Sequence, residues 1–251
     1  MKLLRFLLLA WSLIFVGAAQ ADKLTIAAAS DLRFALDEII EAYRQDHPKN
    51  DIEVVYGSSG KMMTQIMNGA PYDIFFSADI SYPERLRAGG FTATDEAVYA
   101  IGRIVIWSNT LDASKLTLGD LPTDPRISRV AIAQPSHAPY GLRAQEALQA
   151  TAAWETLKPK LVYGENIANT AQMVESGAAD VGIIALSLAK FPAMARHPHH
   201  LINEKLHNPL TQGYVVTKSG GDKPAAANFA GYMETDAAHE IMQRYGFVMP
   251  E

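Results

Sequence analysis

Residues 24–45 read LTIAAASDLRFALDEIIEAYRQ, a short apolar run followed by an amphipathic one. The apolar run, residues 24–28, is typical of a buried β-strand. From Leu32 to Gln45 the apolar side chains recur at helical spacing, which predicts a helix with one face against a core. Only the small and polar residues Ala29-Ser30-Asp31 separate the two. The stretch therefore predicts a strand that leads directly into a helix, the unit from which parallel sheets are built.

The same alternation continues along the whole chain. Further strands are predicted at residues 52–56, 73–76, 103–107, 130–133, 181–185 and 213–216, and around Val162. Further helices are predicted at residues 62–68, 83–88, 142–150, 170–175 and 229–244, and the polar stretch 197–208 is predicted to be a loop. Two α/β lobes of ordinary domain size fit this order, each a mostly parallel mixed sheet flanked by helices. Residues 22–100 and 212–251 are assigned to lobe 1 and residues 101–211 to lobe 2, with a ligand cleft between the lobes.

The first 21 residues have the pattern of a cleavable export signal. Lys2 and Arg5 precede an apolar run from Phe6 to Val16, and Ala19-Gln20-Ala21 places small residues where a signal peptidase cuts. The apolar run is too short for a membrane-spanning helix. We therefore expect residues 1–21 to be removed on export, which leaves a chain that begins at Asp22.

The charge and composition of the chain indicate which classes of binding partner are unsuitable. The formal net charge is −5, and loss of the basic signal segment makes the exported chain more negative, which argues against a nucleic-acid partner. The chain has no cysteine, so its stability in an oxidising compartment depends on a packed core. Because 49% of the residues are hydrophobic, the chain can bury such a core.

Three junctions between a strand end and a helix start are rich in small or hydroxyl residues. They are residues 27–31 (AAASD), 57–60 (GSSG) and 135–141 (PSHAPYG). Each junction leaves backbone N–H groups without partners at the positive end of a helix dipole, which can hold an anion without a formal positive charge. Helix capping alone explains any one of these junctions. Three of them in one chain favour an anion-binding site.

Several blocks of the sequence resemble the periplasmic molybdate-binding proteins of ABC importers. They are residues 27–30, 57–60, 69–73, 77–79, 139–141, 165–167 and 244–247, in the same order as in that family. The resemblance implies a periplasmic-binding-protein-like fold whose two lobes close on one dehydrated oxyanion, molybdate or tungstate. It also implies a periplasmic location, and a membrane permease with its cytoplasmic ATPase as partners. We expect a monomer with no cofactor, no metal cation and no catalytic residues.

The resemblance also implies which residues bind the oxyanion. Ser30 and Ser59 would supply hydroxyl and backbone donors from lobe 1, and the backbone N–H groups of Tyr140 and Ile167 would supply donors from lobe 2. Ser58 is expected to lie next to these donors, with its hydroxyl facing the turn.

Two positions depart from the family pattern. Some members add a tyrosine hydroxyl at the position of Ala185, and the Tyr140 hydroxyl is a candidate to replace it. Asp31 follows Ser30 directly, and a carboxylate aimed at a dianion would repel it, so we expect Asp31 to cap its helix and point away. A carboxylate pointing inward would instead indicate that the ligand carries a proton.

Three alternatives remain open: another oxyanion, a transition metal and a hydrolase reaction. A metal site is suggested by His197, His199, His200 and His207, but Pro198 interrupts the run and the helical spacing of ligand pairs is missing, which favours a solvated loop.

A serine-dependent hydrolase would need an activated serine. The chain has no Gly-x-Ser-x-Gly motif, although His137 could serve Ser30 or Ser59 as a base.

Overall fold

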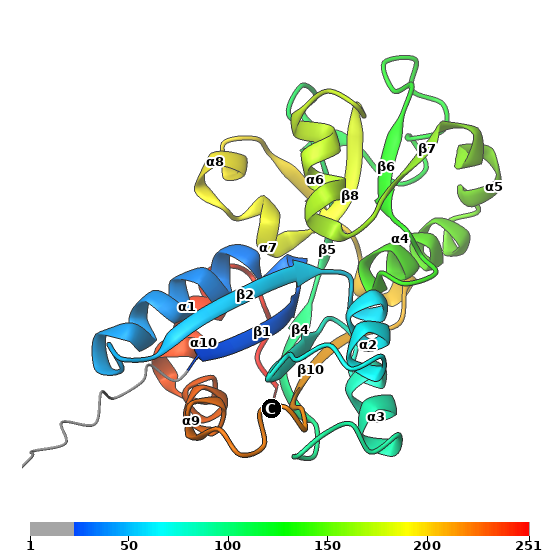
Figure 1. Cartoon of the computed structure of the whole chain (residues 1–251). Coiled ribbons are helices and arrows are strands. Elements are labelled where there is room, and N and C mark those ends of the chain that lie inside the picture. The colour runs from blue at the N-terminus through cyan, green and yellow to red at the C-terminus, as the bar shows by residue number, and fades with distance from the viewer. Residues whose placement is uncertain (1–22, 251) are drawn as a thin grey trace, which may run out of the picture.

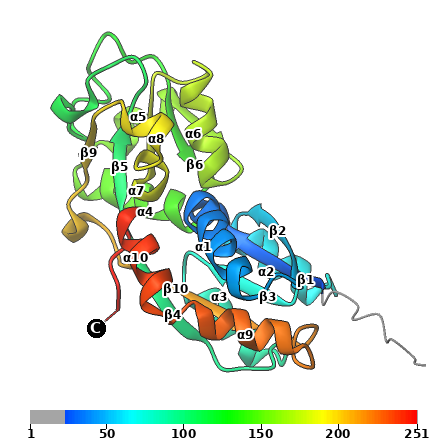
Figure 2. The same ribbon diagram turned by 90° about the vertical axis from the view of Figure 1, so that its left-hand side faces the viewer.

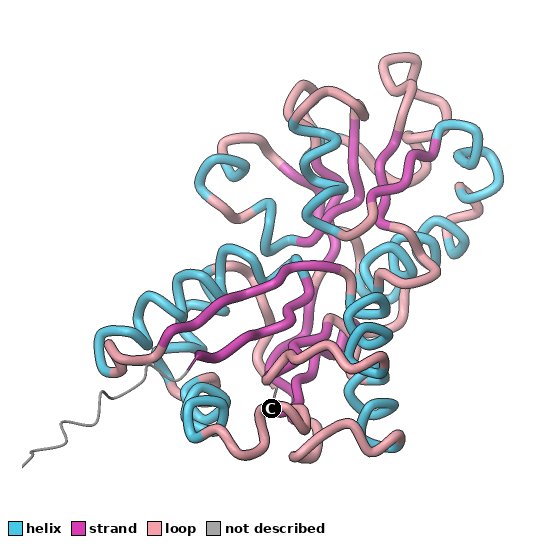
Figure 3. Tube along the Cα trace, in the orientation of Figure 1, coloured by secondary structure: helices cyan, strands magenta, loops and turns pink. Residues whose placement is uncertain are grey.

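The computed structural model describes residues 23–250, so the predicted export signal at residues 1–21 lies outside the described residues. The described chain forms two lobes, one above the other in Figure 1, and each lobe contains a five-stranded sheet. Helices and loops cover the faces of both sheets (Figure 3). No helix within residues 23–250 is long and apolar enough to cross a membrane.

The sheet of lobe 1 has the strand order β2-β1-β3-β10-β4. Its strands are β1 (Lys23–Ala29), β2 (Asp51–Gly57), β3 (Ile74–Ser77), β4 (Ala97–Gly102) and β10 (Leu210–Val216). Strand β1 pairs in parallel with β2 and β3, whereas β10 runs antiparallel to β3 and β4. The helices of this lobe are α1 (Arg33–Asp46), α2 (Ser59–Met67), α3 (Ser81–Ala88), α9 (Pro224–Tyr232) and α10 (Asp236–Arg244). A single 3-10 turn, η1 (Ser30–Leu32), joins β1 to α1.

Side chains of β1 alternate between two cores in lobe 1. Leu24 and Ile26 pack with α1, α9 and α10 on one face, and Ala27 packs with α2 and α3 on the other. Figure 2 shows α1, α9 and α10 together on one side of the sheet. Because successive side chains of a strand point to opposite faces, a wholly apolar strand is the pattern expected for a sheet covered on both sides.

The sheet of lobe 2 has the same arrangement, with the order β7-β6-β8-β5-β9. Its strands are β5 (Ile104–Trp107), β6 (Val130–Ala133), β7 (Leu161–Gly164), β8 (Val181–Ala185) and β9 (His199–Leu201). Its helices are α4 (Pro139–Ala150), α5 (Trp154–Leu157), α6 (Ile167–Glu175), α7 (Leu186–Ala189) and α8 (Pro192–Ala195). The 3-10 turns of this lobe are η2 (Ala113–Lys115), η3 (Lys158–Lys160) and η4 (Glu204–Leu206).

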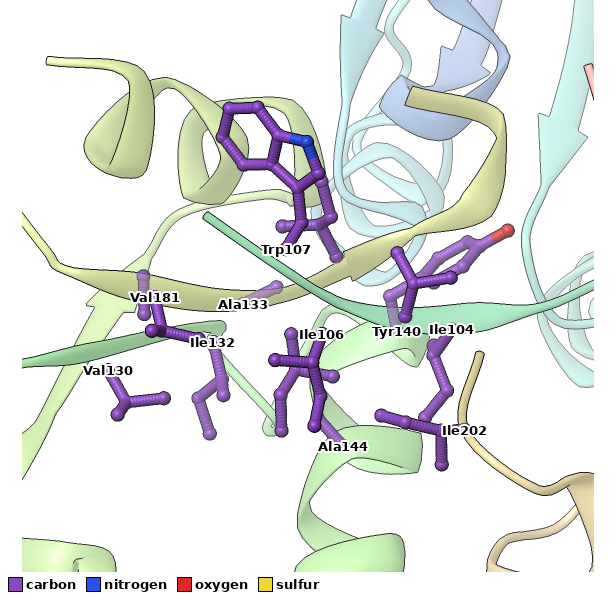
Figure 4. Packing of buried hydrophobic residues seen from close by; sticks show 14 of the residues in the cluster. Ile104, Ile106, Trp107, Val130, Ile132, Ala133, Tyr140, Ala144, Val181 and Ile202 are labelled. Carbon is purple, nitrogen blue, oxygen red and sulfur yellow. The ribbon is translucent and has the colours of Figure 1, made fainter. Parts of the chain in front are cut away.

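The core of lobe 2 forms where β5, β6 and β8 meet α4. Ile106, Ile132 and Val181 are fully buried in this cluster, and Trp107 lies on the other face of β5 from Ile106 (Figure 4). Tyr140 belongs to the same cluster through its ring, but its hydroxyl points away from the aliphatic side chains (Figure 4). The packing therefore holds α4 in place while it leaves one polar atom at the edge of the lobe.

The predicted α/β class with two sheets flanked by helices is confirmed. Each sheet is more evenly mixed than expected, because two of its four strand pairings are antiparallel. The prediction of a loop at 197–208 is wrong in part, because β9 and η4 lie within it. Strand β9 pairs with the edge of β5, and an edge strand can carry polar side chains that hide its character in the sequence.

The two lobes are joined by two neighbouring crossings. The chain leaves the first sheet after Gly102, enters the second at Ile104, and returns to the first at Leu210. Leu210 pairs directly with Gly102, so the two crossings lie side by side at the base of the cleft. This pair of strands forms the hinge of the molecule.

Candidate functional site

A small pocket lies where the two lobes meet. Its lining consists of Ala29, Ser30, Asp31, Gly57, Ser58, Ser59, Ala78, Ala138, Pro139, Tyr140 and Ile167. The structure thus brings together all six residues singled out in the sequence, from both lobes. Neither lysine nor arginine is part of this lining. Any charge held here would have to be balanced by dipoles and hydrogen bonds.

Three helices begin at the pocket: α2 from lobe 1, and α4 and α6 from lobe 2. Their first turns include Ser59, Tyr140 and Ile167. The backbone N–H groups of these three residues make no hydrogen bond within residues 23–250, as expected for the first turn of a helix. Three positive helix ends with free donors therefore converge on one small volume.

The two predicted serines are held differently. Ser59 is fully buried, and its Oγ accepts a hydrogen bond of 3.0 Å from the backbone N–H of Ala78. This bond orients the hydroxyl and leaves its proton available to another acceptor. The Ser30 hydroxyl donates to Asn166 Oδ1 at 3.1 Å and accepts from the N–H of Ala168 at 3.2 Å. Ser30 thus links lobe 1 to the start of α6 in lobe 2.

Asn166 also contributes to the site, although no role was predicted for it from the sequence. Its side chain caps α6 by accepting from the N–H of Asn169 at 2.9 Å, and the same oxygen accepts from Ser30. Asparagine directly before a helix is a strong capping signal, so the cap could have been found in the sequence. The contact with Ser30 could not, because it joins residues 136 positions apart.

The prediction that Asp31 caps its helix and points away is wrong. No side chain caps η1, and Asp31 is only 1% exposed. Its Oδ2 accepts from the Tyr140 hydroxyl at 2.9 Å and from Gln212 Nε2 at 2.8 Å. Its Oδ1 is buried without a hydrogen-bond partner in the described chain. The carboxyl group turns inward because the hinge offers two donors there.

Gln212 and Tyr99 extend this network into the hinge. Gln212, on β10, donates from Nε2 to the Tyr140 hydroxyl at 2.9 Å as well as to Asp31, and its Oε1 accepts from the Tyr99 hydroxyl at 2.6 Å. The Tyr140 hydroxyl therefore gives its proton to Asp31. In this arrangement it does not replace the donor that is absent at Ala185. Neither Gln212 nor Tyr99 carried a signal in the sequence, because their contacts exist only once β4 and β10 pair.

Burial dominates the electrostatics of this network. It raises the pKa of Asp31 from 3.8 to about 6, although the hydrogen bonds from Gln212 and Tyr140, and then the nearby backbone N–H groups of Asp31 and Leu32, partly oppose the shift. Burial also raises the pKa of Tyr140 and of Tyr99 well above 10, and the neighbouring Asp31 carboxylate adds to both shifts. Both tyrosines are therefore neutral near pH 7, and Asp31 is the group of the network that titrates close to neutrality.

Further contacts hold the two lobes together around the pocket. Ser58 was expected to face its turn, but its Oγ lies 2.9 Å from Nδ1 of His137 across the cleft. The N–H of Gly60 donates to the His137 carbonyl at 3.0 Å, and Lys61 forms an exposed ion pair of 2.9 Å with Glu165. The pKa of His137 is lowered by burial and then by the nearby Lys61.

A mostly buried ion pair between Arg143 of α4 and Asp79 joins the two lobes. Arg143 is 7% exposed, and it contacts Asp79 of lobe 1 at 2.8 Å and Glu146 of its own helix at 3.0 Å. Arg143 also donates to the carbonyl of Pro209, next to the crossing at Leu210, so this ion pair lies beside the connection between the lobes.

The histidines of residues 197–208 lie apart from the pocket lining. Within residues 23–250, no group of three or more His, Asp or Glu side chains is arranged to hold a metal ion. His199 is in β9, and His207 Nδ1 lies 2.7 Å from the carbonyl of Asn208. Burial lowers the pKa of both imidazoles.

Comparison with known proteins places this site in context. The model of the family described as bacterial extracellular solute-binding protein matches residues 24–248. The chain is 31% identical over 231 residues to the molybdate-binding protein ModA of Rhodobacter capsulatus, which covers 92% of this chain and 90% of that protein. The solved periplasmic molybdate-binding protein of Azotobacter vinelandii superimposes with a TM-score of 0.85 at 30% identity, over 91% of this chain and 100% of that one. The sulfate-binding protein SubI of Mycobacterium tuberculosis shares the fold, with a TM-score of 0.72 at 13% identity.

Proposed function

Because the chain belongs to the family of bacterial extracellular solute-binding proteins, we propose that it captures molybdate, and also tungstate, in the pocket between its lobes. The proposed donors are the hydroxyl of Ser59, the hydroxyl of Ser30 once its proton turns from Asn166 to the ligand, and the backbone N–H groups of Tyr140 and Ile167. Ser58 and Asp31 lie beside them. The relatives that carry this proposal are the molybdate-binding proteins of two bacteria, which match nearly the whole chain.

One observation supports this function above the others: three helix starts with free N–H groups meet in a small pocket that lacks basic side chains. A fully ionised tetrahedral oxyanion presents only hydrogen-bond acceptors, so its site needs donors. Neutral donors and helix dipoles stabilise the bound charge without a fixed cation. A site without a fixed cation suits a carrier protein, because the bound oxyanion must later be released.

The cargo would pass from the closed protein to a membrane permease driven by a cytoplasmic ATPase. Delivery requires the lobes to separate, and the contacts across the cleft are short-range ones that opening would break. We place the protein in the periplasm as a monomer without a cofactor. In this scheme the pocket binds and releases its ligand without chemical turnover.

Calorimetric titration of the protein lacking residues 1–21 tests the ligand. Molybdate and tungstate should bind with one-to-one stoichiometry, and sulfate and phosphate should bind far more weakly, because the larger ions fill the pocket. In an unfolding experiment, molybdate present at 100 times its dissociation constant should raise the free energy of unfolding by about 2.7 kcal/mol. Equal binding of all four ions would sink the proposed selectivity. The matched variant replaces His197, His199, His200 and His207 with Asn and should bind molybdate normally.

A hydrolase is the second candidate, because the Ser58 hydroxyl lies 2.9 Å from His137 Nδ1. A histidine base is usually oriented by a third group, yet the other ring nitrogen of His137 has no hydrogen bond within residues 23–250. The pair also joins Ser58, and not Ser30 or Ser59 as the sequence suggested. Turnover of chromogenic esters that disappears in Ser58→Ala would favour this candidate.

A further inference from the structure

Asp31 is an unusual group to find in the lining of an oxyanion pocket. It is 1% exposed, it lines the pocket next to Ser30, and one of its carboxyl oxygens, Oδ1, is buried with no partner in the described chain. A buried polar atom without a hydrogen bond is costly, and such atoms are rare in native proteins. A second acceptor would also repel a bound dianion. A proton on Oδ1 would remove both the missing hydrogen bond and the repulsion, because the protonated oxygen can donate to the ligand.

We propose that Asp31 is protonated whenever a dianionic oxyanion fills the pocket, so that the protein binds the dianion together with one proton. This inference rests on the proposed function. The proton comes from bulk water, it is held on Oδ1, and it is donated to an oxygen of the ligand. Oδ2 continues to accept from Tyr140 and Gln212, so the hinge network is unchanged. The repelling oxygen becomes one more donor.

The surroundings of Asp31 favour the neutral form. Tyr140 on α4 and Tyr99 on β4 are the titratable groups of its network, and both are neutral near pH 7. Gln212 on β10 and Ser187 on α7, which donates to the Asp31 carbonyl at 2.8 Å, do not titrate.

Ionisable side chains on the elements around the pocket have partners of their own. On α4, Arg143 is paired with Asp79 and Glu146, and before that helix His137 contacts Ser58. Lys61 on α2 pairs with Glu165, in the loop before α6. Burial, opposed in part by the hydrogen bonds to Oδ2, raises the pKa of Asp31 to about 6, so its protonation near neutral pH requires little further driving force.

The proposal makes affinity depend on pH in a defined way. A carboxyl with a pKa of about 6 is half protonated at pH 6 and about 1% protonated at pH 8, so affinity for a dianion should fall about 50-fold over this interval. The variant Asp31→Asn should show no such fall. Its amide can place a permanent donor where the protonated carboxyl would lie, so at pH 8 it should bind the dianion more tightly than the wild-type protein does.

Calorimetry with sodium molybdate at pH 6, 7 and 8 tests this proposal. Each titration is run in two buffers of different ionisation enthalpy, which measures the protons taken up on binding. The wild-type protein should take up about half a proton per molybdate at pH 6 and close to one at pH 8. Asp31→Asn should take up none at any pH. The control Asp46→Asn, at the exposed end of α1, should behave as the wild type.

The outcomes separate this inference from the proposed function. Tight molybdate binding by the wild type without proton uptake, and with the same pH profile as Asp31→Asn, would overturn the role of Asp31 alone. Failure of the wild type and both variants to bind any oxyanion would overturn the proposed function and this inference with it. A thermal melt of each variant confirms that it is folded before titration.

Discussion

Two buried aspartates lie close to the two ends of strand β1, Asp73 beside its start and Asp31 just after its end. Their hydrogen-bond partners differ. Near its start, Asp73 is fully buried and well partnered: Oδ2 accepts from the N–H of Thr25 at 2.8 Å and from Lys223 Nζ at 2.8 Å, and Oδ1 accepts from Ser219 at 3.2 Å. After its end, Asp31 has two neutral donors on one oxygen and none on the other.

The difference separates a structural carboxylate from a functional one. At Asp73 a lysine compensates the charge and every carboxyl oxygen is satisfied, so the group fastens β1 to the segment that follows β10. At Asp31 no cationic side chain compensates the charge, and the residue lines a pocket shared by both lobes. Unsatisfied groups tend to gather at functional sites, where a ligand completes them. Loss of the carboxylate near the start of β1 should therefore destabilise the protein, whereas loss of the carboxylate past its end should change ligand binding and stabilise the protein at neutral pH.

The largest effect is expected for Asp73→Ala. The substitution leaves Lys223, Ser219 and the Thr25 N–H without their acceptor, and breaking a buried ion pair usually costs 3–5 kcal/mol. Because Lys223 reaches solvent, we expect a loss of about 3 kcal/mol in the free energy of unfolding, measured by urea denaturation. Asp222→Ala, an exposed neighbour, should change it by less than about 0.5 kcal/mol. Unchanged stability of Asp73→Ala would remove the distinction between the two carboxylates.

Asp31→Asn should have the opposite effect and raise the free energy of unfolding at neutral pH. The folded protein holds the Asp31 proton more tightly than the unfolded chain, since its pKa rises from 3.8 to about 6. The contribution of Asp31 to stability is therefore full below pH 3.8 and is lost as the pH rises through 6. At about 1.4 kcal/mol for each pKa unit, the ionised group costs up to about 3 kcal/mol at pH 7. Urea unfolding should show the variant about 1–3 kcal/mol more stable at pH 7 and nearly equal to wild type at pH 4. A less stable variant at pH 7 would contradict this.

Ser59→Ala should weaken oxyanion binding, and it should also cost about 1 kcal/mol of stability because the buried N–H of Ala78 loses its acceptor. The Ser59 hydroxyl is oriented by Ala78 and donates to a charged ligand, and a hydrogen bond of that kind contributes about 1.5–3 kcal/mol. Affinity for molybdate should fall about tenfold to a hundredfold by calorimetry. Ser81→Ala, an exposed serine at the start of α3, is the control and should bind normally. Equal affinity of the two variants would exclude Ser59 from the donor set.

Tyr140→Phe should have the smallest effect on affinity. Its hydroxyl donates to Asp31, whereas the proposed ligand donor is its backbone N–H, which the substitution keeps. Affinity should change by no more than about threefold, and the lost hydrogen bond should cost about 1 kcal/mol of stability. A loss of affinity as large as that of Ser59→Ala would show that the hydroxyl turns toward the ligand instead of the hinge.

The sequence alone determined the α/β class and the two lobes, because strands and helices each impose a spacing on apolar residues. It also placed Ser30 and Ser59 at junctions between a strand and a helix, where free N–H groups must occur. The binding roles of these serines, Tyr140 and Ile167 were implied by the resemblance to the molybdate-binding family. What only the tertiary structure decided is the direction of single side chains. Asp31 turns inward because Tyr140 and Gln212, 109 and 181 positions away, meet it at the hinge. Such contacts depend on how two sheets pair and close, and local sequence contains no trace of partners so distant.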